Sequence, residues 1–511
     1  MKTWSVFSVS SLICIGLISG AQAQSFLDGL NDSSQGEIEL RAQELVQQVI
    51  ARNAQAVFAR LDQGLADDEV LRARSFAQPQ LFAEGGWNDV RRNASSNDTL
   101  SLLSGNDLFT EQRFEVESGV RLRVVTGADI TLSASSTQRE GSNIDNGTEY
   151  SAALSLIVRQ PILRGYQNQL EQWQIEQAQI SQTIAEERLR QQLLRISSEA
   201  LTSYWRLYRQ AEFMQIQARA LENAQALQEE MAFQVNAGRQ PRSALLEAEA
   251  LVLDREIELS DIAQQRRTVQ SDIKSLLNLD GDVYFALQFS PMDQPDLSRF
   301  EQPGDFSQYV EGLLAQWPGY QIARHTIALE RLNARTAEEE NRAQLDLNLG
   351  LVTNSLASRR SDAFSDAFDT DTATWFVSLD YRVPLGPNQR RQADLNSAQL
   401  RQLQADAELR GIRSSLTNEL RARLAQIQEA ERSLAFADRN VSLYRQLYAQ
   451  AFQRFSSGQL PLRQLQERED ELINAQRRYV DATVRYELAR VALQLAEGSL
   501  FANYDVSIST E

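Results

Sequence analysis

Three kinds of side chain that often carry protein chemistry are almost absent from this sequence. Cysteine occurs once, at Cys14, histidine once, at His325, and lysine only at Lys2 and Lys274. A single histidine excludes zinc sites built from paired histidines and leaves little material for a Ser-His triad. Lys274 follows Ile273, whereas a Walker-type nucleotide site needs glycine directly before its lysine. We therefore expect no catalytic residues, no metal site and no cofactor.

Long apolar runs and positive net charge are also missing. No stretch after the N-terminal segment approaches the roughly 18 consecutive apolar residues of a membrane-spanning helix. Any membrane-spanning part would therefore consist of strands. The 69 acidic and 51 basic residues give a net charge of -18, which repels nucleic acid. The 8% aromatic residues and only 10 prolines among 511 residues exclude a disordered or proline-rich linker protein.

The N-terminal segment 1–23 has the pattern of a secretory signal peptide. Lys2 precedes a mostly apolar stretch over residues 4–18, and Ala-Gln-Ala at 21–23 is a small-residue cleavage site. A retained anchor helix is the alternative. Cys14 lies within the apolar stretch and follows a bulky residue, which disfavours lipidation, so the exported chain is expected to be free of cysteine.

Two halves of the chain, 24–300 and 301–511, repeat one order of motifs. Each half has an alternating segment that ends at proline and, later, a segment that passes through glycine to proline. The matching pairs are 155–165 with 378–388, and 232–241 with 451–461. This order and spacing predict two structural repeats of roughly two hundred residues, well beyond the period of a solenoid.

Alternation of apolar and polar residues predicts strands in each half, at about 79–160 and about 344–384. The clearest runs are about ten residues long, the length of a tilted transmembrane strand. A weaker candidate contains Gly85 and Gly86, and an extra alternating pair within 113–137 is joined by Thr126-Gly127. The runs are Tyr150–Val158, Leu345–Leu351, Trp375–Val383, Pro79–Val90, Val120–Val124 and Ile130–Ala134.

Apolar residues spaced three and four apart predict long coiled-coil helices after each strand region. The expected helical hairpins cover 165–278 and 388–498, and their first helix would be roughly 100 Å long. Each returning helix should begin with proline as its first residue. Helices at 37–76 and 305–342 are expected to open the two halves. A soluble helical bundle would explain the same periodicity, so the helices alone do not decide the class.

The strand count restricts the assembly. The chain has four predicted strands in the first half and two in the second, or four in all if the extra pair stays outside the barrel. Both totals are below the roughly eight strands of the smallest transmembrane barrel. An open sheet edge cannot lie in lipid, so several chains must share one barrel. If the strands that lead into the connections 93–112, 138–147 and 354–371 run outward across the membrane, these long connections lie on the outer side of the membrane. The short turn at Thr126-Gly127 then lies on the inner side, which is the arrangement of outer-membrane barrels.

The proline and glycine motifs, in this order behind a signal sequence, resemble the TolC family of outer-membrane efflux and secretion channels. They are the strand-proline junctions Gln160–Gly165 and Val383–Gly386, and two glycine-centred hairpin tips followed by Leu/Ala/Glu-rich helices. The resemblance implies an α+β membrane protein: a trimeric outer-membrane β-barrel continuous with a long periplasmic α-helical coiled-coil barrel. A plain member of the family contributes four strands per chain, so 113–137 would enlarge the barrel or pack elsewhere.

The resemblance also implies a function and partners. The chain would be a passive exit duct of a tripartite efflux pump or type I secretion system, localised to the outer membrane with a large periplasmic part. Its partners would be a periplasmic adaptor protein, an inner-membrane transporter, outer-membrane lipid and two copies of itself. A structural or adhesive coiled-coil envelope protein is the alternative, but it leaves the strands unexplained. A secreted enzyme is disfavoured, because no acidic pair has a recognisable catalytic setting.

The resemblance to the family also implies roles for particular residues of this chain. Adaptor contacts would fall on the two tips, where glycine also permits the chain reversal by itself. The family often has aspartate six residues after the tip glycine at the periplasmic entrance, whereas this chain has Ala244 and Gln464, with Glu247 and Glu467 one turn on. The glutamates would form cation-attracting rings or be merely solvated. The tip residues are Gly238, Arg239, Gln240, Pro241, Gly458, Gln459, Leu460 and Pro461; the barrel-helix junctions are Pro161 and Pro384.

Remaining polar residues have a functional and a plainer interpretation. Five charges fall on the polar side of their strands and would face the lumen, where they tune permeation or only solvate the wall. The acidic segment 361–371 lacks the glycine and terminal glutamate of an EF-hand and is expected to be a solvated loop. His325 is expected to be structural. The five charges are Arg121, Arg123, Arg159, Asp380 and Arg382.

Overall fold

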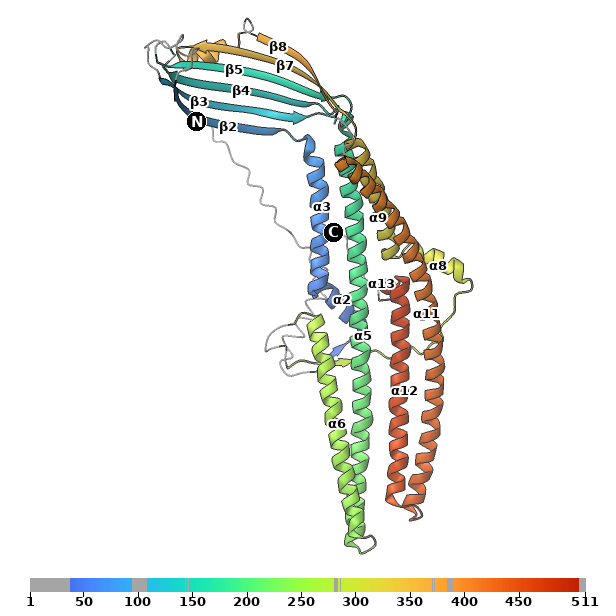
Figure 1. Ribbon diagram of the computed structural model, residues 1–511. Helices are drawn as coiled ribbons and strands as arrows, with labels where there is room; N and C mark the ends of the chain where they lie inside the picture. The colour runs from blue at the N-terminus through green and yellow to red at the C-terminus, as the bar shows by residue number, and fades with distance from the viewer. Residues whose placement is uncertain are drawn as a thin grey trace. The chain divides into compact units, whose positions relative to one another are not determined.

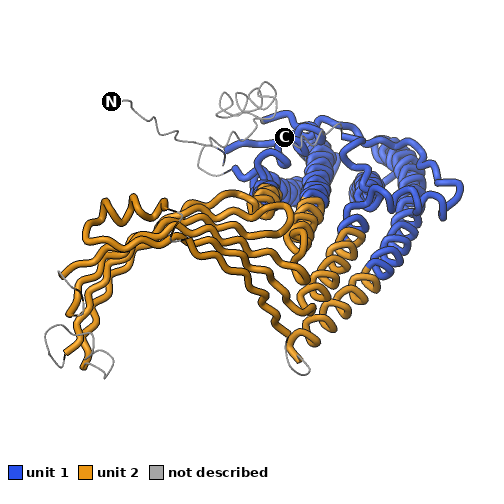
Figure 2. Tube along the Cα trace, turned by 90° about the horizontal axis from the view of Figure 1, so that it is seen from above, with its two compact units in different colours: residues 1–62, 186–322, 409–511 blue, residues 63–185, 323–408 orange. Residues whose placement is uncertain are grey.

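The computed structural model consists of long helices and one large β-sheet (Figure 1). It describes residues 37–93, 108–142, 147–279, 286–369, 373–383 and 389–504, and the single residues 144, 284 and 371. The predicted signal peptide 1–23 and the predicted junction Pro384 lie outside the described residues. Two compact units can be distinguished (Figure 2): unit 1 contains 1–62, 186–322 and 409–511, and unit 2 contains 63–185 and 323–408. Each unit draws on both halves of the sequence, so the two predicted repeats remain a prediction.

Unit 2 contains a six-stranded antiparallel sheet in the order β2-β3-β4-β5-β7-β8. All the strands predicted from alternation are present, and most extend beyond their predicted ends. The extra pair forms β3 and β4, which lie inside the sheet between β2 and β5. The edge strands among the described residues are β2 and β8. The strands are β2 (Gln80–Asn93), β3 (Leu108–Arg123), β4 (Asp129–Gly141), β5 (Glu149–Pro161), β7 (Gln344–Ala357) and β8 (Ala373–Arg382).

Close approach of backbone and side chain explains the two glycines in the middle of this sheet. A Cβ on Gly350 would lie 2.1 Å from the ring of Phe376 on the neighbouring strand. A Cβ on Gly119 would lie 2.5 Å from the carbonyl oxygen of Leu132 and 2.8 Å from the ring of Phe82. Glycine in a strand commonly marks such a place. Phe376, an aromatic residue on the otherwise polar side of β8, therefore covers a glycine.

The predicted helical hairpins are present. The first helices, α5 (Gln169–Asn236) and α11 (Gln389–Ser456), both have 68 residues, and the returning helices are α6 (Arg242–Leu276) and α12 (Leu462–Glu497). Pro241 and Pro461 precede the returning helices as extended N-cap residues, with ψ of 154° and 152°. The prediction that proline would be the first helical residue is therefore wrong by one position.

The helices that open the halves are present but interrupted. The first region folds as α2 (Ala42–Arg52) and α3 (Ala54–Arg74), and the second as α8 (Phe306–Leu314) and α9 (Pro318–Glu340). Asn53 separates α2 from α3 because its backbone is extended. Two strands were not predicted: β1 (Glu37–Leu40) and β6 (Gln288–Pro291) form a parallel pair. Four residues each are too few for alternation to be recognised.

The core of unit 1 surrounds this small parallel pair. Tyr204 of α5 is fully buried, and its hydroxyl donates to the carbonyl of Leu40 (3.3 Å) and accepts from the backbone of Asp293 (2.9 Å). Apolar residues of α2, α6, α12 and α13 (Leu500–Asn503) join α5 in the same cluster. A second cluster packs α8 against α11 and α12. Burial of these faces stabilises the helices at about 25 cal/mol per Å².

Part of the acidic segment 361–371 is helical, contrary to the expected loop. Residues Arg360–Asp366 form α10, which packs on β5 and β7. Ala363 and Ala367 are buried against Ala152, and Thr353 Oγ1 donates to the Ala367 carbonyl (2.5 Å). Alanines four residues apart give α10 a flat face that packs on the sheet. The many carboxylates of this segment favoured a solvated loop in the sequence, and the helix was therefore not predicted. No helix among the described residues is long and apolar enough to span a membrane.

Candidate channel wall and hairpin tips

One face of the six-stranded sheet is apolar and exposed. The register aligns alternate residues of all six strands on this face, which we call the apolar face. Exposed fractions reach 82% at Leu81 and 75% at Trp375, on the two edge strands. Water-exposed apolar patches of this kind mark a surface that contacts lipid or another protein. Its exposed members are Leu81, Trp87, Phe114, Val116, Val120, Leu132, Leu156, Leu349, Leu351, Trp375, Val377, Leu379 and Tyr381.

The apolar face ends in polar residues on the side where β2 terminates. Beyond Trp87 come Asp89 and Arg91, which form an ion pair at 3.2 Å, and Gln112 and Gln138 follow on the adjacent strands. Along β3 the apolar stretch runs over residues 114–122, about the nine to eleven residues of a membrane-crossing strand.

The opposite face of the sheet, the polar face, carries nearly all of the remaining strand charges. The described strands place eight carboxylates and seven arginines there, so the charges almost balance. They are Glu84, Glu111, Glu115, Glu117, Asp129, Glu149, Asp346 and Asp380, with Arg92, Arg113, Arg121, Arg123, Arg139, Arg159 and Arg382. All five charges predicted to face the lumen belong to this face; that the face lines a lumen remains a prediction.

Ion pairs connect neighbouring strands across the polar face. Arg159 Nη2 lies 2.5 Å from Asp346 Oδ2, and the side chain of Gln344 donates to the same oxygen (2.6 Å). Asp346 is only 2% exposed. Its pairing with Arg159 was not predicted. The two residues are 187 positions apart in the sequence, and alternation within each strand does not show how two distant strands align.

Asp380 and Arg121 also have partners on neighbouring strands of the polar face. The side-chain amide of Asn348 donates to Asp380 Oδ2 at 2.5 Å. The Arg121 guanidinium lies over the ring of Phe82, 5.4 Å from its centroid. These contacts hold charged side chains against the sheet. They are compatible with both interpretations of the strand charges, tuning of permeation and solvation of a wall.

Both predicted hairpin tips are helix C-termini closed by left-handed glycine. Gly238 has φ +71° and Gly458 has φ +74°. The next amides, of Arg239 and Gln459, donate to carbonyls five residues earlier (2.9 and 2.8 Å), as in a Schellman motif. All the predicted tip residues except half-buried Leu460 are exposed. The tips are therefore open surfaces, and their contact with an adaptor remains a prediction.

Near their tips, the two hairpins pack against each other. Met231 and Ala248 of the first hairpin form an apolar cluster with Leu462 of the second, flanked by half-buried Ala244 and Phe455. Ala244, one of the positions where the family often has aspartate, thus contributes to packing. Its counterpart Gln464 is exposed.

Glu247 and Glu467 are exposed on their returning helices. Glu467 lies 3.6 Å from Arg463, an i,i+4 pair in which both side chains are well exposed. Such a pair contributes only about 0.3–0.5 kcal/mol. The carboxylates remain available to a solute, and rings of them at an entrance remain a prediction.

A buried polar network links the hairpins farther from the tips. Arg255 of α6 is 5% exposed and forms an ion pair with Asp470 of α12. Its neighbour Glu469, 6% exposed, accepts from the side chain of Asn223 of α5 (3.1 Å), and burial raises the pKa of Glu469. None of these residues was predicted from the sequence. An arginine on the apolar stripe of α6 was the available signal.

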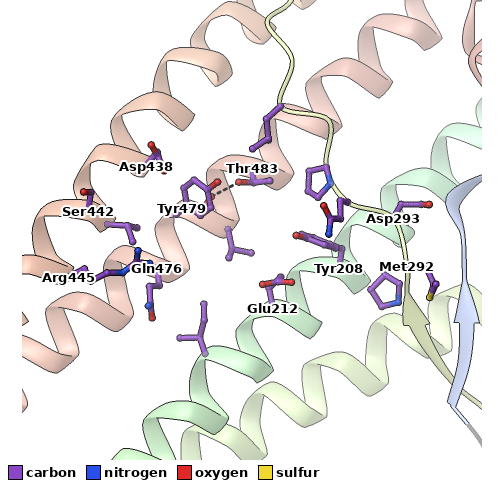
Figure 3. Close-up of a pocket in the computed structure, with 17 residues that line it drawn as sticks. Tyr208, Glu212, Met292, Asp293, Asp438, Ser442, Arg445, Gln476, Tyr479 and Thr483 are labelled. Atoms are coloured by element: carbon purple, nitrogen blue, oxygen red, sulfur yellow. Dashed lines mark hydrogen bonds between the residues drawn. The ribbon is translucent and has the colours of Figure 1, made fainter.

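A groove of about 650 Å³ lies within unit 1, between α5, α11, α12 and the segment after β6 (Figure 3). Tyr208 and Glu212 of α5 face Tyr479 of α12 across it. Burial raises the pKa of Tyr208 to about 12. Within the described part of the chain, no group of three or more His, Cys, Asp or Glu side chains is arranged to hold a metal ion.

The predicted junction Pro161 is the last residue of β5. It pairs with Asp346, and the amide of Ile162 continues the ladder by donating to Leu345 (2.8 Å). The chain then turns through Gly165, φ +81°, into α5. Pro161 is thus the last residue of the strand, although one further ladder hydrogen bond follows it, and its role as a barrel-helix junction remains a prediction.

Comparisons with known proteins agree with this geometry. Residues 320–499 match the family described as "Outer membrane efflux protein". A search of curated protein sequences found no match. Similar solved structures include the outer membrane protein VceC of Vibrio cholerae (16% identity, TM-score 0.65, covering 89% of this chain and 96% of that one). Others are the CmeC channel of Campylobacter jejuni (13%, 0.67, 93% and 88%) and the open MtrE channel of Neisseria gonorrhoeae (17%, 0.64, 90% and 89%).

The structural matches show that this chain shares the fold of outer-membrane channel proteins. At these identities the structural matches show the fold alone, and the family match covers residues 320–499. Together they confirm the resemblance to the TolC family predicted from the sequence. They support an outer-membrane efflux duct and do not favour a structural or adhesive coiled-coil protein.

Proposed function

We propose that three copies of this chain form one outer-membrane exit duct for substrates delivered by an inner-membrane transporter and a periplasmic adaptor. The observation that carries the proposal is the sheet: one face is exposed and apolar, the other is charged, and both edges are unpaired within the described chain. In water an exposed apolar face of this kind would favour aggregation. In a membrane the same face contacts lipid, and the charged face lines an aqueous lumen.

Sharing of the barrel follows from the edges. In lipid, unpaired backbone groups on β2 and β8 would lack hydrogen-bond partners, which costs several kcal/mol per group. In the described sheet β2 and β8 run in opposite directions, so β2 of one copy can pair antiparallel with β8 of the next. A ring of copies thereby closes the sheet without any exposed edge.

The helical hairpins supply the periplasmic part of the duct. The equal lengths of α5 and α11, 68 residues each, support duplication of one structural plan. Six hairpins from three chains would form a helical tunnel, with the exposed tips offered to the adaptor. The energy for transport would come from the inner-membrane transporter, and the chain itself would act as a passive conduit.

A pair of arginine substitutions on β4 tests the lipid-facing role. Leu132, on the apolar face, is 57% exposed in the chain, so Leu132→Arg should be tolerated if that face contacts water. In a membrane each copy of this arginine costs roughly 2–4 kcal/mol near the midplane. We therefore expect Leu132→Arg to abolish outer-membrane assembly. The matched control, Thr131→Arg, places the same charge on the polar face and should assemble.

The readouts are fractionation of the envelope, the mass of the purified complex in detergent, and conductance in planar bilayers. The wild-type chain should be recovered from the outer membrane as a conducting trimer. A folded monomeric rod in the periplasm, equally stable with either arginine, would refute the proposal and restore the coiled-coil alternative.

A further inference from the structure

The β3–β4 hairpin is a full part of the sheet rather than an appendage. β2 pairs with β3 from Gln80↔Arg121 to Asn93↔Leu108, and β4 pairs with β5 from Asp129↔Arg159 to Arg139↔Glu149. The hairpin therefore separates β2 from β5 along nearly their whole length. The resemblance to the TolC family implies four strands per chain, whereas the described sheet has six.

The two faces of the hairpin match those of its neighbours. Phe114 and Val120 of β3 and Leu132 of β4 extend the apolar face, 42%, 40% and 57% exposed. On the other side, Arg139 lies 3.8 Å from Glu111 and 3.9 Å from Glu149, which links β3, β4 and β5. A hairpin outside the wall would expose its charges to lipid or its apolar side chains to water. Only a position within the wall satisfies both faces.

The turn of the hairpin is fastened to the start of α5. Asn168, 2% exposed, donates from Nδ2 to the Val124 carbonyl (2.7 Å), and Gln160 Nε2 donates to the Thr126 carbonyl (2.9 Å). A Cβ on Gly127 would approach the Gly165 carbonyl to 3.0 Å, so the turn and the junction are in tight contact.

An ion pair at the foot of the hairpin strengthens this anchor. Arg123 bonds to Asp129 through Nε (2.6 Å) and also pairs with Glu171 in the first turn of α5. These contacts fix the height of the hairpin relative to the strand-helix junction. A hairpin that lay outside the barrel wall would not need these contacts.

We infer that the assembled barrel has eighteen strands, six from each of three copies, and that its exit is wide and weakly ion-selective. This inference rests on the proposed trimer. Barrel diameter grows roughly linearly with strand number, so eighteen strands give a bore about 1.5 times that of twelve, in the range where porins hold an aqueous channel. With eight carboxylates and seven arginines per polar face, size rather than charge selects what leaves. The cargo class that needs such an exit is bulky hydrophilic solutes.

Disulfide mapping of the full-length chain tests where the hairpin lies. The register aligns Ala83, Ser118, Ala134 and Leu154 in one row across four strands. The pair Ala83→Cys with Ser118→Cys should cross-link in the native trimer. Ala83→Cys with Leu154→Cys should not, because three strand spacings separate them by about 14 Å. Ser133→Cys with Ser155→Cys is a second expected link, since their hydroxyl oxygens lie 2.7 Å apart.

A deletion tests the width of the exit. Replacing residues 94–148 with a short Gly/Ser connection removes β3 and β4 and leaves β2 and β5 to pair directly. The largest polyethylene glycol that enters from the sheet side in planar-bilayer recordings should have a radius about 1.5-fold smaller than for the full chain. A control that shortens only 98–104 should leave this limit unchanged.

The possible outcomes separate this inference from the proposed function. Eighteen strands in an electron cryomicroscopy map, with the predicted cross-links, support it. A trimeric outer-membrane channel with twelve strands, in which Ala83→Cys and Leu154→Cys do cross-link, overturns the inference and leaves the proposed duct intact. Absence of any outer-membrane assembly overturns both. If the deletion variant fails to assemble, the cross-links and the map still decide.

Discussion

Two glycines, one within α11 and one just after it, have opposite effects on the helix. Gly458 ends α11 with φ +74°, whereas Gly411 lies in the middle of the same helix, where a Cβ would have no neighbouring atom within 4 Å. Alanine at 411 should stabilise the hairpin by about 0.5–1 kcal/mol, because glycine is costly inside a helix. Alanine at 458 should destabilise it by about 1 kcal/mol, because a Cβ disfavours left-handed backbone.

Thermal unfolding followed by circular dichroism at 222 nm measures both glycine variants against the wild type. The expected result is a shift of opposite sign for Gly411→Ala and Gly458→Ala. Equal shifts of the same sign would contradict the assignment of Gly458 as the residue that reverses the chain.

Asp346 links β7 to β5 through its ion pair with Arg159. It is 2% exposed and accepts from Arg159 and Gln344, so Asp346→Asn should cost about 1–2 kcal/mol. Asp89→Asn is the matched control, because its side chain is less buried (23% exposed) and its partner Arg91 is 67% exposed, and it should change stability by less than about 0.5 kcal/mol. Urea unfolding in detergent, followed by tryptophan fluorescence, compares them. A smaller loss at 346 than at 89 would refute this ranking.

At the scale of elements, the segment after β6 is held to α12 by polar contacts. Glu487 accepts from the backbone amide of Asp296 (2.6 Å), and Arg490 donates to the carbonyl of the same residue (2.7 Å). Tyr486 Oη donates to the carbonyl of Ser298 (2.6 Å). The connection between the two halves of the sequence is thereby packed as part of the fold and is not a free linker.

Burial gives this attachment a pH dependence. Desolvation raises the pKa of Glu487 to about 7, although Arg490 and the Asp296 amide act in the opposite direction. The folded chain keeps the proton up to this pH, while the unfolded chain loses it near the ordinary value of 4.5. Stability from this group is therefore complete below about pH 4.5 and is lost as the pH rises to about 7.

Glu487→Gln should flatten the dependence of melting temperature on pH between about 4.5 and 7, because the amide does not ionise. The control is Glu471→Gln, an exposed glutamate of the same helix (side chain 40% exposed), which should leave the slope unchanged. Melting curves at several pH values provide the measurement. An unchanged slope in Glu487→Gln would show that this carboxyl is not the buried acid responsible.

At the scale of the whole molecule, the proposed trimer brings three copies of Glu247 and of Glu467 together. Their side chains are exposed and would attract cations at the periplasmic entrance. Replacing both with glutamine should lower the cation selectivity of the channel while conductance at high salt changes little. Reversal potentials in a planar bilayer under a salt gradient provide the measurement. Unchanged selectivity would mean that these glutamates are only solvated surface charges.

Sequence periodicity was sufficient for most elements. Alternation predicted all six strands of the large sheet, and spacing by threes and fours predicted both long hairpins, because these patterns reflect which side of an element is apolar. The short elements β1, β6 and α10 were not predicted, because they contain too few residues for a hydrophobic period to be recognised. The tips were predictable since glycine followed by proline encodes a chain reversal locally.

What the sequence determined by itself is local: strand or helix, the polar and apolar side of each, and where the chain turns. The tertiary structure decided which strands are neighbours, and so placed β3 and β4 inside the sheet and Asp346 beside Arg159. It also buried Arg255 with Asp470 and Glu487 beneath the segment after β6. The physical reason is that register and burial depend on the free energy of contacts between distant segments, which no local pattern contains.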